Sequence, residues 1–311
     1  MSKIEHERMD NGNMELKQIT EKTFYIPGLT NIGLYLDGDQ VILIDSGNDE
    51  WTGRKIYRLL EKQGWHLRTI INTHSNADHI GGNNYLQKKT NCDIAAMAIE
   101  STFIEHPDLE PFLLWVAYPF KSLRNKFLQA QPSRVTCIIK DEGPITATHL
   151  TAFPLAGHFL QMIGIKTPDE VYFLADSLFS PEIFEKYTLT VCADVEAMLK
   201  TYLLLEKIEG KYFIPSHAKL TDNIQDLIKI NKGHLLKISS IVASLCDTPI
   251  SREDILAAIA RNHNVELSSS QFVLTLITIS AHLSYLFDQK IIHPIFENGK
   301  MLWQRLSIGR L

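Results

Sequence analysis

The chain has 311 residues, of which 45% are hydrophobic and 22% charged, an ordinary balance for a globular protein of one or two domains. Its formal net charge of −5 at pH 7 excludes a generally basic protein that binds nucleic acid through charge alone. The four cysteines stand far apart and form no CxxC pair, so neither a disulfide framework nor a zinc knuckle is indicated.

The sequence carries no clear signal for export or membrane insertion. The N-terminal segment MSKIEHERMD is charged and lacks the apolar stretch of a secretory signal. The most apolar run, FVLTLITISAHLSYLF at 272–287, is interrupted by Thr, Ser and His, and we expect it to be too short and too polar to span a membrane. We therefore expect a cytoplasmic protein with reduced thiols and no membrane association.

The first third of the chain alternates between strand-like and helix-like segments. Apolar runs at 22–28, 31–38 and 40–47 are typical of strands. Apolar residues recur at helical spacing in 51–64, and a further buried strand follows at 68–74. This alternation predicts an α/β fold in which helices cover the strands.

Residues 100–134 interrupt the alternation. Aromatic and proline residues are frequent there, which predicts a helical insertion with much apolar surface. Its residues Phe112 and Trp115 could belong to a lid over a site, to a homodimer contact or to added core. The sequence leaves these three alternatives open.

Strands resume after the insertion, at 136–145, 149–157 and 162–176, with a hairpin turn predicted at ProAspGlu 168–170. An amphipathic helix at 193–208 and a last short strand at 211–217 follow.

The character of the chain changes after residue 222. Two helical stretches, at 224–246 and 252–262, precede the apolar run described above. Asn298 and Gly299 then separate two apolar runs, which predicts a β-hairpin. Helices followed by a hairpin suggest a winged-helix module, so we predict one domain over 14–222 and a second over 223–311.

Histidines and aspartates gather where predicted strands end. In an open α/β structure, loops at strand ends present functional groups to one cleft. Imidazole and carboxylate ligands suit zinc, iron or manganese. The residues concerned are Asp45, His74, Asp78, His79, His158, Asp176 and His217.

The order of these motifs resembles the metallo-β-lactamase superfamily. The pattern D-S-G, then H-x-N-x-D-H-x-G-G, then G-H, A-D and S-H runs through residues 14–220. The resemblance implies a four-layer αββα sandwich with a metal site at one edge of two packed sheets. The tail is similar to the winged-helix tail of some hydrolases of this fold, one group of which includes an endoribonuclease. The glyoxalase-II-like branch is the nearest general comparison.

The resemblance also implies two adjacent metal sites bridged by Asp176. The second site would use Asp78, His79 and His217. The first would use His74, the residue at 76 and His158.

Asn76 stands where this family has a histidine, and its amide oxygen is a harder donor and a poorer zinc ligand than imidazole. Three interpretations stay open. One metal binds, either in the second site or on His74, His158 and Asp176, a set that suits non-haem iron and is similar to that of persulfide dioxygenases. Two metals bind, with Asn76 as a weak ligand. Alternatively the site is degenerate and the protein is not an enzyme.

The leading hypothesis is a hydrolase whose metal-bound hydroxide attacks a small-molecule ester, thioester or lactone. Zinc, one ion or two, is the expected cofactor, with iron or manganese as alternatives. Asp78 would orient the nucleophile or accept its proton, and Asp45 would support the ligands from behind. Tyr187 would hydrogen-bond the substrate, or would simply pack at a helix end. Gly81 and Gly82 would allow a close backbone approach.

Two other functions compete with this hypothesis. One is a mononuclear iron oxygenase of the persulfide dioxygenase type. The other is nucleic-acid binding or cleavage through the winged helix. Residues 232–311 hold eight Lys or Arg against six Asp or Glu, and the apolar segment 274–287 has no Lys or Arg to meet phosphate. We therefore do not expect nucleic acid as a partner, and a small molecule is the expected one.

Overall fold

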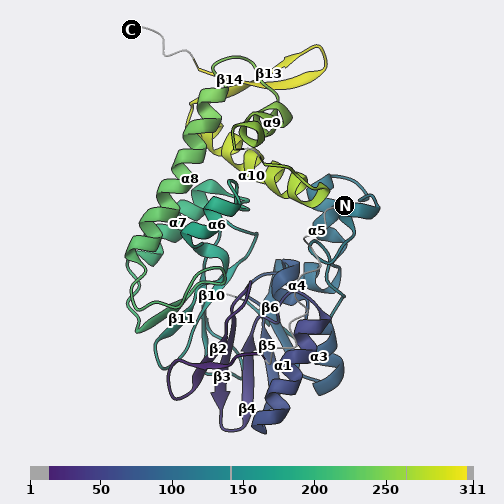
Figure 1. The fold of residues 1–311 in the computed structure, drawn as a ribbon, viewed down its shortest axis with the longest axis vertical. Coiled ribbons are helices and arrows are strands. Elements are labelled where there is room, and N and C mark those ends of the chain that lie inside the picture. Colours follow the sequence, from purple (N-terminus) through teal and green to yellow (C-terminus); the bar gives the residue numbers. More distant parts are fainter. Residues whose placement is uncertain (1–13, 141, 264, 307–311) are drawn as a thin grey trace.

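The computed structural model describes residues 14–140, 142–263 and 265–306 (Figure 1). Its first sheet has seven strands that neighbour one another in chain order. The early strands pair antiparallel, and the pairs from β4 to β7 are parallel. The strands are β1 (Lys17–Gln18), β2 (Thr23–Ile26), β3 (Ile32–Asp37), β4 (Gln40–Ile44), β5 (His66–Ile71), β6 (Asp93–Met97) and β7 (Cys137–Ile139).

The second sheet has five strands in the order β12-β11-β10-β9-β8. The hairpin that joins β10 to β11 turns at 168–170, as the sequence predicts. Only β11 and β12 pair parallel, because a helix lies between them in the chain. The strands are β8 (Gly143–Pro144), β9 (Thr151–Pro154), β10 (Ile163–Lys166), β11 (Val171–Phe173) and β12 (Tyr212–Ile214).

The two sheets pack face to face over an apolar layer to which both contribute, with Ile42 and Ile71 from the first and Ile165 and Phe173 from the second. Helices cover both outer faces. Two of them, α1 (Glu50–Gln63) and α3 (Asn83–Thr90), bury an apolar stripe against the first sheet. Two others, α7 (Val195–Leu205) and α8 (Gln225–Leu245), cover the second sheet. This is the predicted four-layer αββα sandwich.

The predicted helical insertion is present as α4 (Ala98–Glu105), α5 (Leu109–Trp115) and the short 3-10 helix η1 (Lys121–Leu123). It packs on the start of α10 (Ser269–Asp288), at the upper right of Figure 1. Leu123 and Leu128 pack there against Val273. The insertion therefore joins the sandwich to the C-terminal helices.

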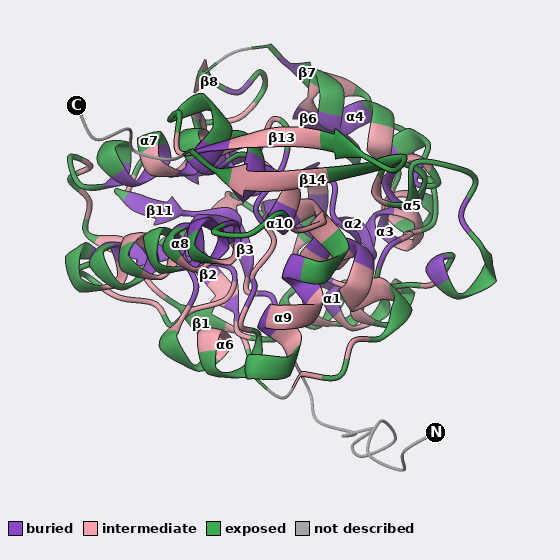
Figure 2. Ribbon diagram, turned by 90° about the horizontal axis from the view of Figure 1, so that it is seen from above, coloured by how far each residue is buried: buried purple, intermediate pink, exposed green. Residues whose placement is uncertain are grey.

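The C-terminal region consists of α8, α9 (Arg252–Asn262) and α10, followed by the predicted hairpin of β13 (Ile292–Glu297) and β14 (Lys300–Arg305). Asn298 and Gly299 both adopt a positive φ, of 51° and 74°, which a two-residue hairpin turn requires. The hairpin lies at the far end of the molecule and is coloured mainly as intermediate or exposed in Figure 2. Its relation to a winged helix stays a prediction.

The division at residue 222 also stays a prediction. The last strand of the second sheet ends at Ile214 and α8 begins at Gln225, so the boundary falls in a connecting segment. However, Ile228 and Leu235 of α8 share an apolar cluster with Tyr202 of α7. The C-terminal helices therefore extend the core of the sandwich.

Helix α10 is longer than the apolar run suggests. It begins with a capping box formed by Ser268 and Gln271 and has 20 residues. By length and composition alone it could cross a membrane, with a mean hydropathy of 1.3 over an 18-residue window of which 39% is buried. The expectation that this segment is too short and too polar was therefore wrong on both counts. Its buried side chains pack against α8 and α9, as in the core helix of a domain.

His282 of α10 gives this core a measurable pH dependence. Its Nδ1 lies 2.9 Å from the Ser239 hydroxyl of α8. Burial, together with nearby His234, lowers the pKa of His282 from 6.5 to about 4. As the pH falls through this window, the unfolded chain takes up a proton that the folded chain still excludes. The free energy of unfolding should therefore fall by up to about 3 kcal/mol on account of this group.

The variant His282→Gln keeps a hydrogen-bonding side chain beside Ser239 but cannot titrate. We expect the stability of the wild type relative to this variant to decrease from about pH 7 to about pH 4. Urea denaturation of both metal-free proteins across this range measures the difference. A difference that does not change with pH would contradict the assignment.

Candidate metal centre

Six histidine and aspartate side chains that lie far apart in the sequence meet at the edge of the sandwich. His74 follows β5, and the short helix α2 (Ala77–Ile80) carries Asp78 and His79. His158 follows β9. The 3-10 helix η2 (Ala175–Ser177) after β11 carries Asp176, and His217 follows β12. The predicted collection of functional groups at strand ends is confirmed.

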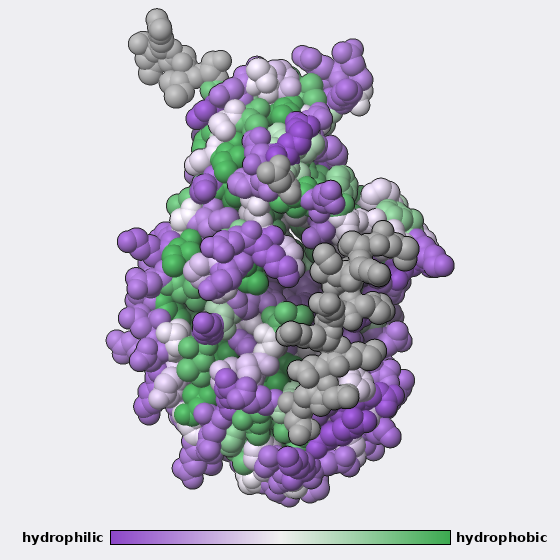
Figure 3. Space-filling model, viewed as in Figure 1, coloured by the Kyte–Doolittle hydropathy of each residue, from purple (hydrophilic) through white to green (hydrophobic). Residues whose placement is uncertain are grey.

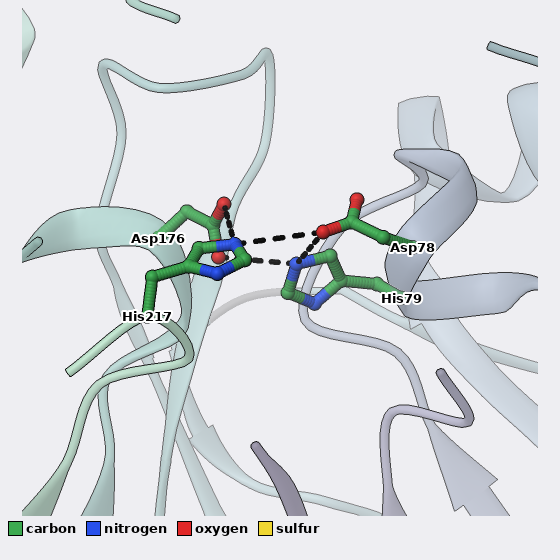
Figure 4. A group of neighbouring side chains, drawn as sticks. All are labelled: Asp78, His79, Asp176 and His217. Carbon is green, nitrogen blue, oxygen red and sulfur yellow. Dashed lines mark ion pairs between the residues drawn. The ribbon is translucent and has the colours of Figure 1, made fainter. Parts of the chain in front are cut away.

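One half of the cluster holds Asp78, His79, Asp176 and His217, whose ligand atoms all lie within 4.8 Å of one another. Figure 4 shows Asp78 and His79 reaching in from one side and Asp176 and His217 from the other. The Nε2 atoms of His79 and His217 each lie 3.0 Å from a different oxygen of Asp176. The same two nitrogens lie 3.6 and 3.5 Å from Asp78 Oδ2.

The other half holds His74, His158 and Asp176, whose ligand atoms also lie within 4.8 Å of one another. His158 Nε2 lies 3.5 Å from Asp176 Oδ2 and 3.2 Å from Asn76 Oδ1. Asp176 therefore belongs to both halves, as a bridging ligand would. The two halves are those that the family resemblance implied.

Asp45 controls the proton positions of two histidines. His79 Nδ1 lies 2.7 Å from Asp45 Oδ2, and a carboxylate can only accept, so this nitrogen carries the hydrogen. The Thr73 hydroxyl also donates to Asp45 Oδ2, at 2.7 Å. Having given its own hydrogen away, that hydroxyl accepts from His74 Nδ1 at 3.0 Å. The supporting position predicted for Asp45 is confirmed.

The other two histidines are fixed by backbone carbonyls, which can also only accept. His158 Nδ1 donates to Val191 O at 3.0 Å, and His217 Nδ1 donates to Leu29 O at 2.7 Å. All four rings thus carry a hydrogen on Nδ1 and turn Nε2 inward. When neutral, each ring presents a bare lone pair to the centre of the cluster.

Three of the inward atoms are buried without a hydrogen-bond partner: His74 Nε2, His79 Nε2 and Asp176 Oδ1. The last two lie only 3.0 Å apart, within a group of ligand atoms that all lie within 4.8 Å of one another. Buried polar atoms are almost always paired, and a bound ion is one of the explanations for those that are not. The donor set of imidazoles and carboxylates fits a divalent ion.

The electrostatics of the metal-free cluster agree with this. Burial lowers the pKa of His217, but Asp176 and Asp78 outweigh it and raise the value to about 10. Burial lowers the pKa of His79 too, and the neighbouring carboxylates, Asp176 foremost, raise it well above its ordinary range. In contrast, burial and nearby His79 hold the pKa of His74 well below 6.5. The two histidines that face the carboxylates therefore bind protons strongly in the metal-free cluster, and a metal must displace these protons.

The loop after α2 depends on the two glycines noted in the sequence. A Cβ on Gly81 would lie 2.2 Å from the carbonyl carbon of Asn48, and one on Gly82 would lie 2.4 Å from Ser46 O. Both neighbours are backbone atoms that cannot rotate away. The predicted close approach is confirmed, and it ties the metal loop to the turn after β4.

The variant Gly81→Ala should therefore lose about 1–3 kcal/mol of stability or more, because the clash forces backbone to move. The matched control is Gly233→Ala in α8, where no described atom outside the neighbouring backbone of the helix lies within 4 Å of the added Cβ. That change should stabilise the protein by roughly 0.5–1 kcal/mol, since alanine is the better helix former. Thermal unfolding of both variants measures the difference. Equal effects would contradict the packing argument.

Two buried glutamates support the metal loop from α4 and α5, and sequence reasoning missed both. Glu100 accepts from the backbone and hydroxyl of Ser75, at 3.0 and 2.6 Å, and from Gln161 N at 2.7 Å. It thereby joins the loop of His74 to the loop of His158. Glu110 accepts from Asn76 Nδ2 at 2.7 Å. The sequence feature that could have indicated them is an acidic residue within each of two apolar helical segments.

Tyr187 lies at the C-terminal end of α6 (Pro181–Lys186) and is 38% exposed. It lines a surface pocket of about 670 Å³ together with Lys237 and His263 of the C-terminal helices. Among the described residues of the metal cluster, none lines that pocket. A role for Tyr187 in substrate binding stays a prediction.

A sequence model described as the metallo-beta-lactamase superfamily matches residues 25–217, more than half of the chain. The match includes every histidine and aspartate of the cluster. The chain belongs to the metallo-β-lactamase superfamily.

Solved structures of this superfamily share the fold. A beta-lactamase domain protein from Burkholderia ambifaria is 17% identical, with a TM-score of 0.72 and 94% of each chain covered. A metallo-beta-lactamase family protein from Thermus thermophilus is 14% identical, with a TM-score of 0.69 and coverage of 94% of this chain and 99% of its own. FIM-1 from Pseudomonas aeruginosa, in its mono-zinc form, is 16% identical, with a TM-score of 0.55 and coverage of 73% and 96%. The first two of these matches each cover 94% of this chain, so they include its C-terminal helices.

Proposed function

We propose that this chain is a hydrolase with a two-metal site and that its substrate is a small-molecule ester, thioester or lactone. One observation supports it most strongly: four histidines, three of them buried, share one tautomer and turn Nε2 toward a carboxylate common to both halves of the cluster. The metal residues would be His74, Asn76 and His158 on one side, Asp78, His79 and His217 on the other, with Asp176 between them.

A divalent ion, zinc first and manganese or iron second, supplies Lewis acidity there and lowers the pKa of a water ligand. The residues of the chain provide orientation and access. The Asp78 side chain is 33% exposed and that of His217 15%, against 6% or less for the other paired members of the cluster. The open side of the site therefore lies at Asp78 and His217.

Asp78 is the residue best placed to orient the attacking water. Its Oδ2 accepts from the Thr30 hydroxyl at 3.0 Å and faces His79 and His217. These contacts, among the described residues, all use Oδ2, so Oδ1 is the oxygen that can accept from a water. Leu29, next to Thr30, is 91% exposed beside His217 and offers an apolar contact for an acyl group.

The test is hydrolysis of a panel of aryl esters, thioesters and lactones by protein loaded in turn with zinc, manganese and iron. We expect turnover of at least one of these classes that a chelator abolishes and that does not consume oxygen. Loaded protein that hydrolyses none of them would argue against the proposal.

A second candidate is the iron oxygenase of the persulfide dioxygenase type. His74, His158 and Asp176 form a two-histidine, one-carboxylate set, which favours iron and leaves coordination positions open. Oxygen consumption by the iron-loaded protein with a persulfide substrate, without hydrolysis of the panel, would favour this candidate.

We do not extend the proposal to nucleic acid. Many side chains of α10 are buried in the core of the C-terminal region. Figure 3 shows hydrophobic residues, in green, between hydrophilic ones over these helices. A gel shift with RNA at low salt would reveal binding if it occurs.

We propose a cytoplasmic location, which the four free cysteines support. The expected lack of membrane association stays a prediction. A homodimer through the exposed apolar residues of the insertion, such as Val116 and Tyr118, stays a prediction that sedimentation would test.

A further inference from the structure

The side chain of Asn76 is held at both ends. Its Nδ2 donates to Glu110 Oε1 at 2.7 Å, and its Oδ1 lies 3.2 Å from His158 Nε2. Asn76 is 9% exposed and Glu110 5%, so water does not compete for these contacts. The orientation of the amide is therefore set by the protein.

The side chain of Asn76 does not cap the helix that it precedes. It is the N-cap of α2, a position at which asparagine usually accepts from the backbone of the first turn. Here its side chain makes no such hydrogen bond. The oxygen that would cap the helix faces His158 instead.

That contact joins two acceptors. His158 Nδ1 carries the hydrogen, since it faces the carbonyl of Val191, so Nε2 of the neutral ring is a lone pair. An amide oxygen and an imidazole lone pair at 3.2 Å repel each other unless a donor or cation lies between them. Asp176 Oδ2, 3.5 Å from the same nitrogen, adds a third acceptor. With the ring of His158 neutral, three acceptors converge there, an arrangement that suits a cation.

We infer that Glu110 is a positioning residue that turns the Asn76 amide so that its oxygen completes a metal site with His74, His158 and Asp176. This inference rests on the proposed function. Glu110 Oε1 can accept whether or not the carboxyl group carries a proton, because the acid form keeps its carbonyl oxygen. The reversed amide would aim its NH₂ group at the metal and would demand a donor from Glu110.

The helical insertion thus has a role at the metal. Glu110 lies on α5, and the insertion is anchored on α10 where Asn125 donates to Ser270 at 2.9 Å. A site of two imidazoles and two oxygens is harder than one with three imidazoles. It should favour manganese and iron relative to zinc more than a three-histidine site does.

The test is titration of the metal-free protein with cobalt, followed by visible absorption and by calorimetry. The wild type should bind two equivalents. Glu110→Met, similar in length but without the acceptor, should weaken one of the two by about 10- to 100-fold, as loss of a ligand's supporting hydrogen bond does. Glu110→Gln, whose amide oxygen can still accept, should stay close to the wild type. Two equivalents bound by Glu110→Met with wild-type affinity would overturn the inference.

A double-mutant cycle separates positioning from a merely structural effect. In an Asn76→Ala background, Glu110→Met should cause no further weakening, because the amide that Glu110 holds is gone. Equal weakening in both backgrounds would show that Glu110 does not act through Asn76, and would sink the inference.

A crystal structure of the wild-type protein with cobalt tests the inference without relying on the folding of a variant. It should place Asn76 Oδ1 at about 2.0–2.2 Å from an ion that also contacts His74 and His158. An ion bound without the Asn76 oxygen would overturn the inference. These readouts are independent of catalysis, so a site that binds metal in this way but hydrolyses nothing would refute only the proposed function.

Discussion

Replacing Asp176 by alanine is expected to remove metal from both halves of the centre and to abolish hydrolysis. Among the described residues, Asp176 is the one carboxylate that belongs to both groups of ligand atoms. Its two oxygens lie 3.0 Å from His79 Nε2 and from His217 Nε2. Loss of a supporting residue behind a ligand costs about 10- to 100-fold in metal affinity. Loss of the bridge itself should cost at least about 100-fold at each half.

Metal content after dialysis against a weak chelator measures this directly, with hydrolysis of the best substrate as a second readout. The matched control is Asp169→Asn, which alters another hydrogen-bonded aspartate, one that accepts from Thr23 and Thr167 near the β10–β11 turn. The control should keep its metal. If Asp176→Ala keeps both ions, the ligand assignment is incorrect.

The second large effect is expected from Asp45→Asn, a change of one atom. Asp45 has a φ of 63°, a conformation that asparagine tolerates better than most residues, so the backbone can stay as it is. The amide oxygen can still accept from Thr73 N, which lies 2.8 Å from Asp45 Oδ1. The new NH₂ group must then face His79 Nδ1 and the Thr73 hydroxyl.

His79 can accept from that NH₂ group only by moving its hydrogen to Nε2, the atom that would ligate the metal. If the new NH₂ group donates to the Thr73 hydroxyl, that hydroxyl can donate to His74 Nδ1, which moves the hydrogen of His74 to Nε2 as well. We expect metal affinity to fall by about 100-fold or more, the upper part of the range for supporting residues, because two ligands are affected. The fold should be retained.

Calorimetric zinc titration of Asp45→Asn tests the prediction, with circular dichroism to verify folding. Nitrogen-15 chemical shifts of the histidine rings would report the tautomers themselves. Wild-type affinity together with unchanged tautomers would contradict the role assigned to Asp45.

The residues of the centre were predictable from sequence because each stands next to a regular element. Asp45 follows β4, His74 follows β5 and His217 follows β12, and each strand is a short buried run that the apolar pattern indicates. The parallel strands β4 and β5 carry their carboxyl ends to one edge of the first sheet, so the meeting of Asp45 and His74 follows from the topology. His217 joins them because the second sheet packs on the first. The alternation of apolar strands and helices predicted an α/β fold, whereas the four-layer αββα sandwich was implied only by the resemblance to the metallo-β-lactamase superfamily.

Glu110 was not predictable, because its contact with Asn76 depends on how the insertion folds back. The two residues are 34 positions apart, and the placement of α5 depends on packing against α10, far along the chain. No local pattern encodes such a contact. A buried acid in an apolar helix is a signal of some partner, but it does not say which one.

The central claim is that the centre holds two metals despite the asparagine at position 76. The measurement that tests it most directly is metal content by mass spectrometry, on protein purified without added metal and again after reconstitution with zinc, manganese and, anaerobically, iron. The account predicts close to two ions per chain after reconstitution, and one or fewer in Asn76→Ala and Glu110→Met after dialysis. A single ion per chain that neither substitution affects would contradict it.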